Sequence, residues 1–361
     1  MRILIIANND VGLFKFRREL IETLLHKYEV CICLPNGEFV SKLVDMGCKY
    51  YPCEFDRHST NPIAELKQVL FYKRIVKSLQ PDVVLTYTVK PNVYAGMVCA
   101  SMNVPYIANI TGLGTAIENG GMMQKFLLAL YRYGLRKAKM VFFQNEANLN
   151  FMLSKGVLRS AYTLIPGSGV NLSEHVLEKY PESEKPIVLV TIGRIMKEKG
   201  ADEIIYAAEK IRLKHPDVVF RLIGGFDGDY EKRVQQAVNE GVIEYLGHQS
   251  DVHHFLKNAH AIVHPSYHEG MSNVLLEAAS CGRPIIATDV PGCRETYQDG
   301  VSGISFKPKD GEGLVQAIEK FLSLSYDAKV NMGISGRQKV EKEFDRNIVI
   351  EKYVNEIEKV K

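Results

Sequence analysis

Short apolar runs of strand length alternate with amphipathic segments of helical spacing along almost the whole chain. The run RILIIAN (2–8) is followed by FRRELIETLLHKY (16–28), whose apolar residues have helical spacing, and then by EVCICLP (29–35). Strands that alternate with helices predict βαβ units, in which helices cover both faces of a parallel sheet. The pattern therefore indicates an α/β fold.

The alternation breaks in the Gly-, Ser-, Pro- and charge-rich stretch 166–186 and then restarts. A chain of 361 residues is also too long for one ordinary core. We therefore predict two doubly wound, Rossmann-like domains, 1–170 and 171–345, with a C-terminal helix at 346–361 that rejoins the first. Open α/β sheets bind ligands beyond the carboxyl ends of their strands, so two such edges that face each other would form one cleft.

The composition, with 46% apolar and 24% charged residues, is that of a soluble globular protein. No apolar run reaches the roughly 18–20 residues that a membrane span needs. We interpret the N-terminus as a first strand, because it lacks the pattern of a signal peptide. The seven cysteines have no paired CxxC spacing, which favours reduced core thiols in a cytosolic protein.

The net charge of +3 is unevenly distributed. Residues 1–170 carry 20 Lys and Arg against 12 Asp and Glu, whereas residues 171–361 carry 25 against 30. A basic first half suggests that this half faces an anionic partner, such as a phosphate-bearing substrate, an anionic membrane or a nucleic acid. We expect no nucleic acid, because no stacking motif accompanies the basic residues.

The stretch HEGMSNVLLEAA (268–279) follows a strand-like run and should open a helix. Gly270 allows a close backbone approach to a ligand, and Ser272 and Asn273 are residue types that cap helices. The amides of a helix N-terminus, together with the positive end of its dipole, suit a phosphate. This segment is therefore a candidate phosphate site.

Two glutamates stand eight residues apart in the same stretch. Glu277 lies about one turn into the predicted helix and can point back toward its start. Beside a phosphate, the carboxylates of Glu269 and Glu277 would serve best as acceptors for sugar hydroxyls. The alternative is that Glu269 is a loop acid and Glu277 a surface residue of the helix.

A second candidate site, GRIMKEKG (193–200), directly follows the strand-like PIVLVTI. Arg194 offers bidentate geometry and Lys199 a point charge, and two fixed cations at a strand end can flank a diphosphate. An exposed charged loop is the alternative interpretation of this run.

Together these segments resemble the retaining glycosyltransferases of sequence family 4, which have the GT-B fold. The E-x7-E spacing from Glu269 to Glu277 is that family's hallmark. In the first half the chain looks like the branch that builds bacterial capsular, exopolysaccharide and lipid-linked glycans. The stretches that carry the resemblance are TIGRIMKEKG, HEGMSNVLLEAASCGRPIIATD and PGCRETYQDGVSG in the second half, and GLFKFRREL, TVKPNVYAG and VPYIANITGLG in the first.

The resemblance implies a role for each matching side chain. Arg194 and Lys199 would grip the donor diphosphate and, with Glu269, form the catalytic set. Glu269 would contact hydroxyls of the transferred sugar, and Glu277 would accept hydrogen bonds from the ribose. The domain 1–170 would bind the acceptor and the domain 171–345 the nucleotide-sugar donor.

Further donor contacts would come mainly from the backbone. They would involve Gly12, whose loop would close over the diphosphate; Gly247, near the base; and Gly270, Met271, Ser272 and Asn273, whose amides would hold the distal phosphate. Arg294 and Glu295, after a Pro-Gly turn, would support the site.

Charge would build on the leaving diphosphate, where two cations and a helix N-terminus are already aimed. We therefore expect neither a metal nor a cofactor. Asp227-Gly228-Asp229 reads DxD, a metal–diphosphate motif of the other large glycosyltransferase fold, and keeps a metal open as an alternative. Core or loop positions are expected for the histidines, which lack ligand spacing such as HExxH: His253, His254, His260, His264 and His268.

Many members of the family place a histidine where this chain has Thr111. No base is evident in the first domain, so the family implies a front-face mechanism in which the leaving phosphate oxygen takes the proton of the incoming hydroxyl. We assign Lys90, Thr111 and Gly112 to the acceptor side.

The segment 122–140 combines Phe, Leu and Tyr with five Lys and Arg. A basic amphipathic helix can lie on an anionic bilayer, whereas an ordinary packing helix with a solvated face is the alternative. We predict a cytoplasmic protein that is peripheral at the inner face of the plasma membrane. The oligomeric state stays open.

The predicted activity is retaining transfer of a hexose or N-acetylhexosamine from a UDP-sugar to a hydroxyl of a polyprenyl-diphosphate-linked glycan. UDP is favoured over GDP by the family alone. The alternatives are a nucleotide-sugar epimerase or hydrolase of the same fold, and a non-catalytic two-lobed sugar-binding protein. A dinucleotide-dependent dehydrogenase is disfavoured, because no strand is followed by GxGxxG.

Overall fold

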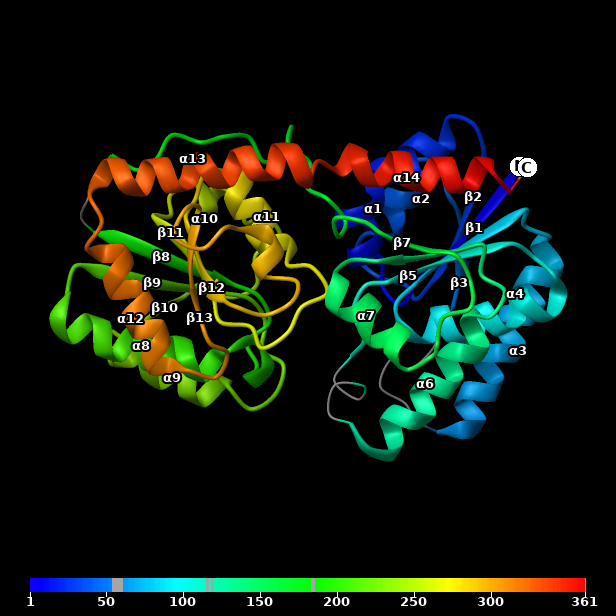
Figure 1. Cartoon of the computed structure of the whole chain (residues 1–361), viewed down its shortest axis with the longest axis horizontal. Coiled ribbons are helices and arrows are strands. Elements are labelled where there is room, and N and C mark those ends of the chain that lie inside the picture. The colour runs from blue at the N-terminus through cyan, green and yellow to red at the C-terminus, as the bar shows by residue number, and fades with distance from the viewer. Residues whose placement is uncertain (54–60, 115–116, 118–119, 183–185, 361) are drawn as a thin grey trace. The chain divides into compact units, whose positions relative to one another are not determined.

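The computed structural model describes residues 1–53, 61–114, 117, 120–182 and 186–360 (Figure 1). The chain forms two compact units, one of Met1–Ser168 with Asn347–Lys361 and the other of Gly169–Arg346. The predicted boundaries were 1–170 with 346–361, and 171–345. Residues 183–185 of the predicted linker lie outside the described residues.

The first unit is built on a seven-stranded parallel sheet in the order β3-β2-β1-β4-β5-β6-β7. Its strands are β1 (Arg2–Ile6), β2 (Glu29–Leu34), β3 (Lys49–Pro52), β4 (Val83–Tyr87), β5 (Tyr106–Ile110), β6 (Met140–Phe143) and β7 (Tyr162–Leu164). The order reverses between β1 and β4, where a crevice opens at the carboxyl ends of an open α/β sheet.

Helices cover both faces of this sheet, and β1 shows why. Ile3 and Ile5 belong to the core on one face, whereas Leu4 and Ile6 belong to the core on the other. A strand buried on both sides reads as a continuous apolar run. The first core packs against α1 (Asp10–Leu25), α2 (Val40–Asp45) and α14 (Arg346–Glu358), and the second against α3 (Pro62–Leu79), the π-helix η1 (Pro91–Ala95), α4 (Gly96–Met102), α6 (Gly121–Leu135) and α7 (Glu146–Ser154).

Three helices of the first unit begin at an asparagine. Asn9 accepts a hydrogen bond from the Gly12 amide at the start of α1, and Asn145 caps α7 in the same way. Asn61 caps α3, with a proline in the first turn. Each cap satisfies an amide that the helix itself leaves without a partner.

The second unit contains a six-stranded parallel sheet in the order β10-β9-β8-β11-β12-β13. Its strands are β8 (Ile187–Ile192), β9 (Val218–Ile223), β10 (Glu244–Tyr245), β11 (Ala261–His264), β12 (Ile285–Thr288) and β13 (Gly303–Phe306). The order reverses between β8 and β11.

Helices flank the second sheet as well (Figure 1), and they pack on it through two apolar cores. One core includes residues of α8 (Ala201–Lys214), α9 (Glu231–Asn239) and α12 (Gly311–Leu322), and the other includes residues of α10 (His253–Lys257), α11 (Asn273–Ser280) and α13 (Tyr326–Glu343). The short 3-10 helices η2 (Lys197–Lys199) and η3 (Arg294–Thr296) lie in loops. The predicted pair of doubly wound α/β domains is confirmed.

All seven cysteines are buried and free, which agrees with reduced core thiols. Among the described residues, no helix combines the length and the apolar character that crossing a bilayer requires.

Candidate active site

The switch point of the second sheet brings the predicted donor-binding loops together. Strands β8 and β11 are hydrogen-bonded neighbours in parallel, so the segments that follow them leave the same edge. The first segment contains Lys199 and the second Glu269. These residues are 70 positions apart in the sequence, and their side chains meet.

The carboxylate of Glu269 is held between two nitrogens. Lys199 Nζ donates to Glu269 Oε1 at 2.5 Å, and His264 Nε2 lies 3.0 Å from the same oxygen. The side chains of Glu269 and Lys199 are 14% and 23% exposed. Burial by itself raises the pKa of Glu269, but Lys199 and His264 outweigh it and hold this pKa well below its usual range. The acid is therefore ionised at neutral pH.

Ser272 is the N-cap residue of α11, but its hydroxyl does not cap the helix. Its Oγ lies 3.2 Å from His264 Nε2, so the two side chains and Glu269 form one connected set. The amide of Ser272 donates to the carbonyl of Gly292 at 2.8 Å. The Ser272 amide, one of those assigned to the distal phosphate, therefore already donates a hydrogen bond within the protein.

The Pro-Gly turn after β12 packs against the backbone of Glu269. Gly292 has φ +83°, and a Cβ at this position would lie 2.6 Å from the carbonyl oxygen of Glu269. The amide of Gly292 donates to Glu295 Oε2 at 2.7 Å, so Glu295 holds the turn as expected. Arg294 instead pairs with Asp289 at 2.9 Å.

Arg194 lies in the same loop as Lys199 but has a different partner. Its guanidinium forms an ion pair with Asp227, the first acid of the DxD run, and its side chain is 52% exposed. The two loops also touch through backbone, because a Cβ on Gly224 would lie 1.8 Å from the carbonyl oxygen of Gly193. A metal bound at the DxD run would need the carboxylate of Asp227. That carboxylate instead pairs with Arg194, a cation of the predicted donor loop.

The other residues of the second unit that were assigned to the donor lie near these loops in the chain. The carbonyl of Gly247 accepts from the amide of Gly224 at 2.8 Å, which ties the loop after β10 to the loop after β9. Met271 is a buried core residue. Gly270 and Glu277 are half-buried, the latter in α11.

Gly12 does not lie in a loop, contrary to the prediction. It occupies the first turn of α1, because Asn9 caps the helix and accepts from the Gly12 amide at 2.6 Å. A Cβ on Gly12 would lie 3.0 Å from the Asn9 oxygen. Gly12 belongs to the first unit, where it forms the beginning of the helix that follows β1.

The residues assigned to the acceptor side follow two neighbouring strands of the first unit. Lys90 follows β4, and Thr111 and Gly112 follow β5, its parallel neighbour. Lys90 Nζ forms a 2.7 Å ion pair with Glu65, and both side chains are largely buried. Between β4 and the π-helix, Thr88 has φ +71°. A β-branched residue in this conformation is strained, and such strain concentrates at functional sites.

Two residues at the carboxyl edges of the two sheets were not predicted from the sequence to belong to a site. His264 was grouped with core and loop histidines, although its position at the carboxyl end of a central strand was a usable signal. The strain at Thr88 left no signal in the residue type, because positive φ is typical of glycine or asparagine.

Both halves of the chain match protein-family models. Residues 173–339 match the model described as "Glycosyl transferases group 1", and residues 2–145 match "Glycosyl transferase 4-like".

Among curated proteins, a relative from Campylobacter jejuni is 29% identical over 100% of this chain and 99% of its own length. It is an N,N'-diacetylbacillosaminyl-diphospho-undecaprenol alpha-1,3-N-acetylgalactosaminyltransferase. A second protein from this organism is 23% identical over 91% of this chain and 90% of its own length. It is a 4-alpha-N-acetylgalactosaminyltransferase that acts on an N-acetylgalactosamine-N,N'-diacetylbacillosaminyl-diphospho-undecaprenol.

Solved structures share the fold. Anabaena Alr3699/HepE in complex with UDP and glucose superimposes with a TM-score of 0.80 at 17% identity, covering 98% of both chains. Sucrose-phosphate synthase from Thermosynechococcus elongatus also gives 0.80, at 19% identity, over 100% of this chain and 99% of its own.

Proposed function

Since this chain is a glycosyltransferase, with a glycosyltransferase 4-like first half and a group 1 second half, we propose that it is a retaining N-acetylhexosaminyl- or hexosyltransferase. Its donor would be a UDP-sugar, and its acceptor a hydroxyl of an undecaprenyl-diphosphate-linked glycan. The two Campylobacter jejuni relatives, which transfer N-acetylgalactosamine to such lipids, support this choice of acceptor and favour an N-acetylhexosamine.

One observation carries the proposal for the donor site: a buried, ionised Glu269 held by Lys199 and His264 beside the start of α11. An ionised Glu269 offers only acceptor oxygens, which suits hydrogen bonds from sugar hydroxyls. Lys199 would contact a donor phosphate in addition to this carboxylate. The cation and the helix N-terminus would place the positive charge before the reaction begins, so little reorganisation is needed.

In the reaction we propose, the bond between the anomeric carbon and the diphosphate oxygen breaks, and UDP leaves. Its developing negative charge would be stabilised by Arg194, Lys199 and the N-terminus of α11. The acceptor hydroxyl would bond to the same face of the anomeric carbon. Its proton would pass to the leaving phosphate oxygen, so no side-chain base and no metal are required.

Two helices of the first unit support a place at the membrane surface. Both contact η1 and α4, and both expose large apolar side chains: Ile63, Leu66 and Leu70 on α3, and Met122, Met123, Phe126 and Tyr133 on α6. Exposed Lys and Arg accompany them: Lys67, Lys73, Arg74 and Lys77 on α3, and Lys125 and Arg132 on α6. We propose that this α3–α6 surface rests on the anionic inner face of the plasma membrane.

A thermal-shift series tests the donor. UDP, GDP, and the UDP derivatives of glucose, N-acetylglucosamine and N-acetylgalactosamine are compared at equal concentrations. At about 100 times its Kd, a ligand adds about 2.7 kcal/mol to the stability of the folded state. We expect shifts with UDP and with a UDP-N-acetylhexosamine. A shift with GDP alone would contradict UDP as the donor nucleotide. No shift with any of these ligands would contradict the proposed donor site.

Substitution of Glu277 tests the predicted ribose contact. Loss of a hydrogen bond to a carboxylate costs about 1.5–3 kcal/mol, so Glu277→Ala should weaken UDP binding by about 10- to 100-fold. Glu209→Ala, on the exposed side of α8, is the matched control. Isothermal titration with UDP measures both, and unchanged affinity in Glu277→Ala would contradict the assignment.

Release of free sugar or an epimer without acceptor would favour the hydrolase or epimerase alternative.

A further inference from the structure

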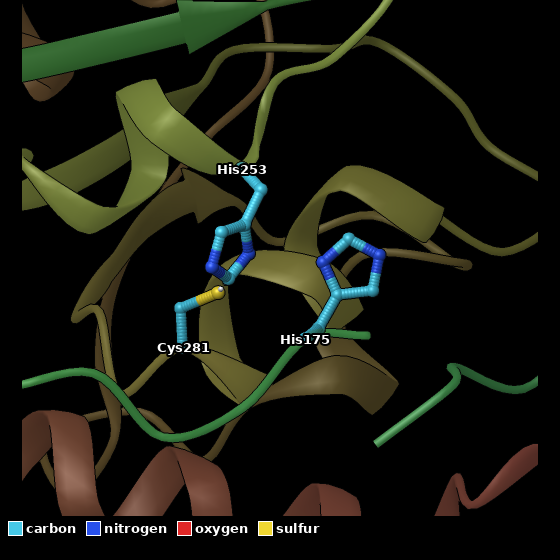
Figure 2. A group of neighbouring side chains, drawn as sticks. All are labelled: His175, His253 and Cys281. Carbon is cyan, nitrogen blue, oxygen red and sulfur yellow. Dashed lines mark hydrogen bonds between the residues drawn. The ribbon is translucent and has the colours of Figure 1, made fainter. Parts of the chain in front are cut away.

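Three side chains with metal-binding atoms converge in the second unit (Figure 2). None of the three residues is assigned to the donor, although the amide of Cys281 donates to the carbonyl of Glu277 at 3.1 Å. His175 precedes β8, His253 is the first residue of α10, and Cys281 is the C-cap residue of α11. Their candidate ligand atoms all lie within 4.8 Å of one another. Distant parts of the chain are thus brought to one point.

The distance between two of these atoms fits a tetrahedral ion. The thiol sulfur of Cys281 lies 3.6 Å from Nδ1 of His253. Zinc binds sulfur at about 2.3 Å and imidazole nitrogen at about 2.0–2.1 Å, so a tetrahedral angle separates the two ligand atoms by about 3.5 Å. An ion could bind both with little movement.

His175 supplies the third atom. Its Nδ1 is buried and has no hydrogen-bond partner among the described residues. A buried polar atom without a partner is costly, and a metal would provide one. The main chain holds this residue in place, because its amide donates to Asn171 at 2.9 Å and its carbonyl accepts from Arg337 at 2.7 Å.

A carboxylate behind His253 selects its ligand nitrogen. Nε2 of His253 lies 3.0 Å from Glu178 Oε1. If Nε2 carries the proton and donates to Glu178, Nδ1 keeps its lone pair on the side of the thiol. Metal-bound histidines characteristically donate their other ring nitrogen to a carboxylate in this way. Lys257 Nζ lies 3.1 Å from Glu178 Oε2 and helps to orient that carboxylate.

We propose that His175, His253 and Cys281 form a zinc site, with water as the fourth ligand. Zinc would bind the thiolate, so each ion taken up displaces the thiol proton of Cys281 to solvent. The ion would fasten the segment that leads into β8 onto α10 and α11. This role is structural, and it leaves the expectation of metal-free sugar transfer unchanged, because the site shares no residue with the donor site.

Binding of Co²⁺ and Zn²⁺ to the metal-free full chain tests the proposal. Co²⁺ bound to a thiolate gives a near-ultraviolet charge-transfer band, which zinc should then abolish at one equivalent per chain. Cys281→Ser should lose this band, and His175→Ala and His253→Ala should each weaken zinc binding by at least about 100-fold in competition with a chromogenic chelator. Glu178→Gln keeps all three ligands and should weaken binding by about 10- to 100-fold.

Matched controls distinguish this site from other thiols and histidines. Cys99→Ser, a buried thiol of the first unit, and His254→Ala, the exposed neighbour of His253, should bind cobalt and zinc like the wild type. Circular dichroism of the metal-free variants confirms that each is folded. If the wild type shows no charge-transfer band, or if Cys281→Ser binds zinc as tightly as Cys99→Ser, the proposal is wrong.

Discussion

A single carboxylate, Glu269, shows how the environment of one residue prepares the site. A carboxylate that is 14% exposed keeps its charge only because Lys199 and His264 contact the same oxygen. An ionised group that is buried without such partners would instead take up a proton. The sequence indicated Glu269 and Lys199 separately, whereas their contact required the sheet that joins β8 to β11.

Removal of Lys199 should therefore destabilise the second unit. Lys199→Met removes the lysine partner of the buried carboxylate, and breaking a buried pair in this way costs about 3–5 kcal/mol. Lys214→Met removes a lysine that is 65% exposed from its pair with Glu319, and should cost less than about 1 kcal/mol. Hydrogen exchange of the β11 and α11 amides measures both. Equal losses of stability in the two variants would show that the ion pair between Lys199 and Glu269 does not stabilise the second unit.

The same pair predicts the direction of a pH effect. Because the pKa of Glu269 in the folded state is lowered from 4.5, its contribution to stability is fully present above pH 4.5. This contribution should decline as the pH falls below that value, because the unfolded state then binds a proton that the folded state resists. Urea unfolding between pH 7 and pH 3 should show a steeper acid loss in the wild type than in Lys199→Met. Parallel curves would contradict the linkage.

At the scale of elements, the turn after β12 positions the residues before α11. Gly292 is buried, has φ +83° and lies against the backbone of Glu269. Gly300 has a similar φ of +74° but open space around the position of a Cβ. Substitution of these two glycines therefore separates the effect of backbone strain from the effect of steric contact.

Gly292→Ala should therefore cost more than Gly300→Ala. Both pay for a left-handed conformation, about 1–2 kcal/mol, but only the first forces a methyl group into a carbonyl, which adds about 1–3 kcal/mol. Urea unfolding measures the stability difference. Gly292→Ala should also weaken donor binding because Glu269 must shift. Similar losses in both variants would contradict this role of the turn.

The α3–α6 surface makes a prediction about membrane binding. Leu66→Ser with Phe126→Ser removes two exposed apolar side chains, each worth about 1.5–3 kcal/mol when fully buried. The double variant should bind anionic vesicles at least about 10-fold more weakly. Leu213→Ser, at 82% exposure on α8, is the control and should bind like the wild type. Sedimentation with vesicles at low and high salt measures the binding. If binding of the wild type did not depend on the salt concentration, an electrostatic contribution would be contradicted.

Secondary structure was largely readable from local pattern, with informative exceptions. The first helix was expected from Phe16, but α1 begins at Asp10, because Asn9 supplies a cap that the apolar spacing does not reveal. The π-helix at Pro91–Ala95 was not expected either. Both depend on individual hydrogen bonds at the end of a segment, and periodicity reports only the face that a segment buries.

At the scale of the molecule, the chain returns to its first unit through α14. Tyr353 is 1% exposed there, and its ring centroid lies 4.6 Å from that of Phe142. Its hydroxyl accepts a 2.5 Å hydrogen bond from the side chain of Asn109 on β5. A residue near the C-terminus thus completes the core of the N-terminal sheet.

Tyr353→Ala should consequently destabilise strands that lie far away in the sequence. Truncation of a buried aromatic costs about 3–5 kcal/mol, whereas Tyr133→Ala, at a half-exposed position of α6, should cost less than about 1 kcal/mol. Faster hydrogen exchange in β4 and β5, with β8 and β11 unchanged, is the expected result. If Tyr353→Ala left β4 and β5 unaffected, α14 would not support that sheet.

Local patterns predicted the α/β class, the two domains and the residue types assigned to the donor, because strand and helix periods and short motifs are local properties of a chain. Which groups meet, in contrast, depended on how the strands and helices pack. The tertiary structure joined Lys199, His264 and Glu269 through neighbouring strands, used the Ser272 amide internally and placed Gly12 in a helix. It also assembled His175, His253 and Cys281 from three segments. Such contacts depend on strand order and on packing between distant residues, which no local pattern records.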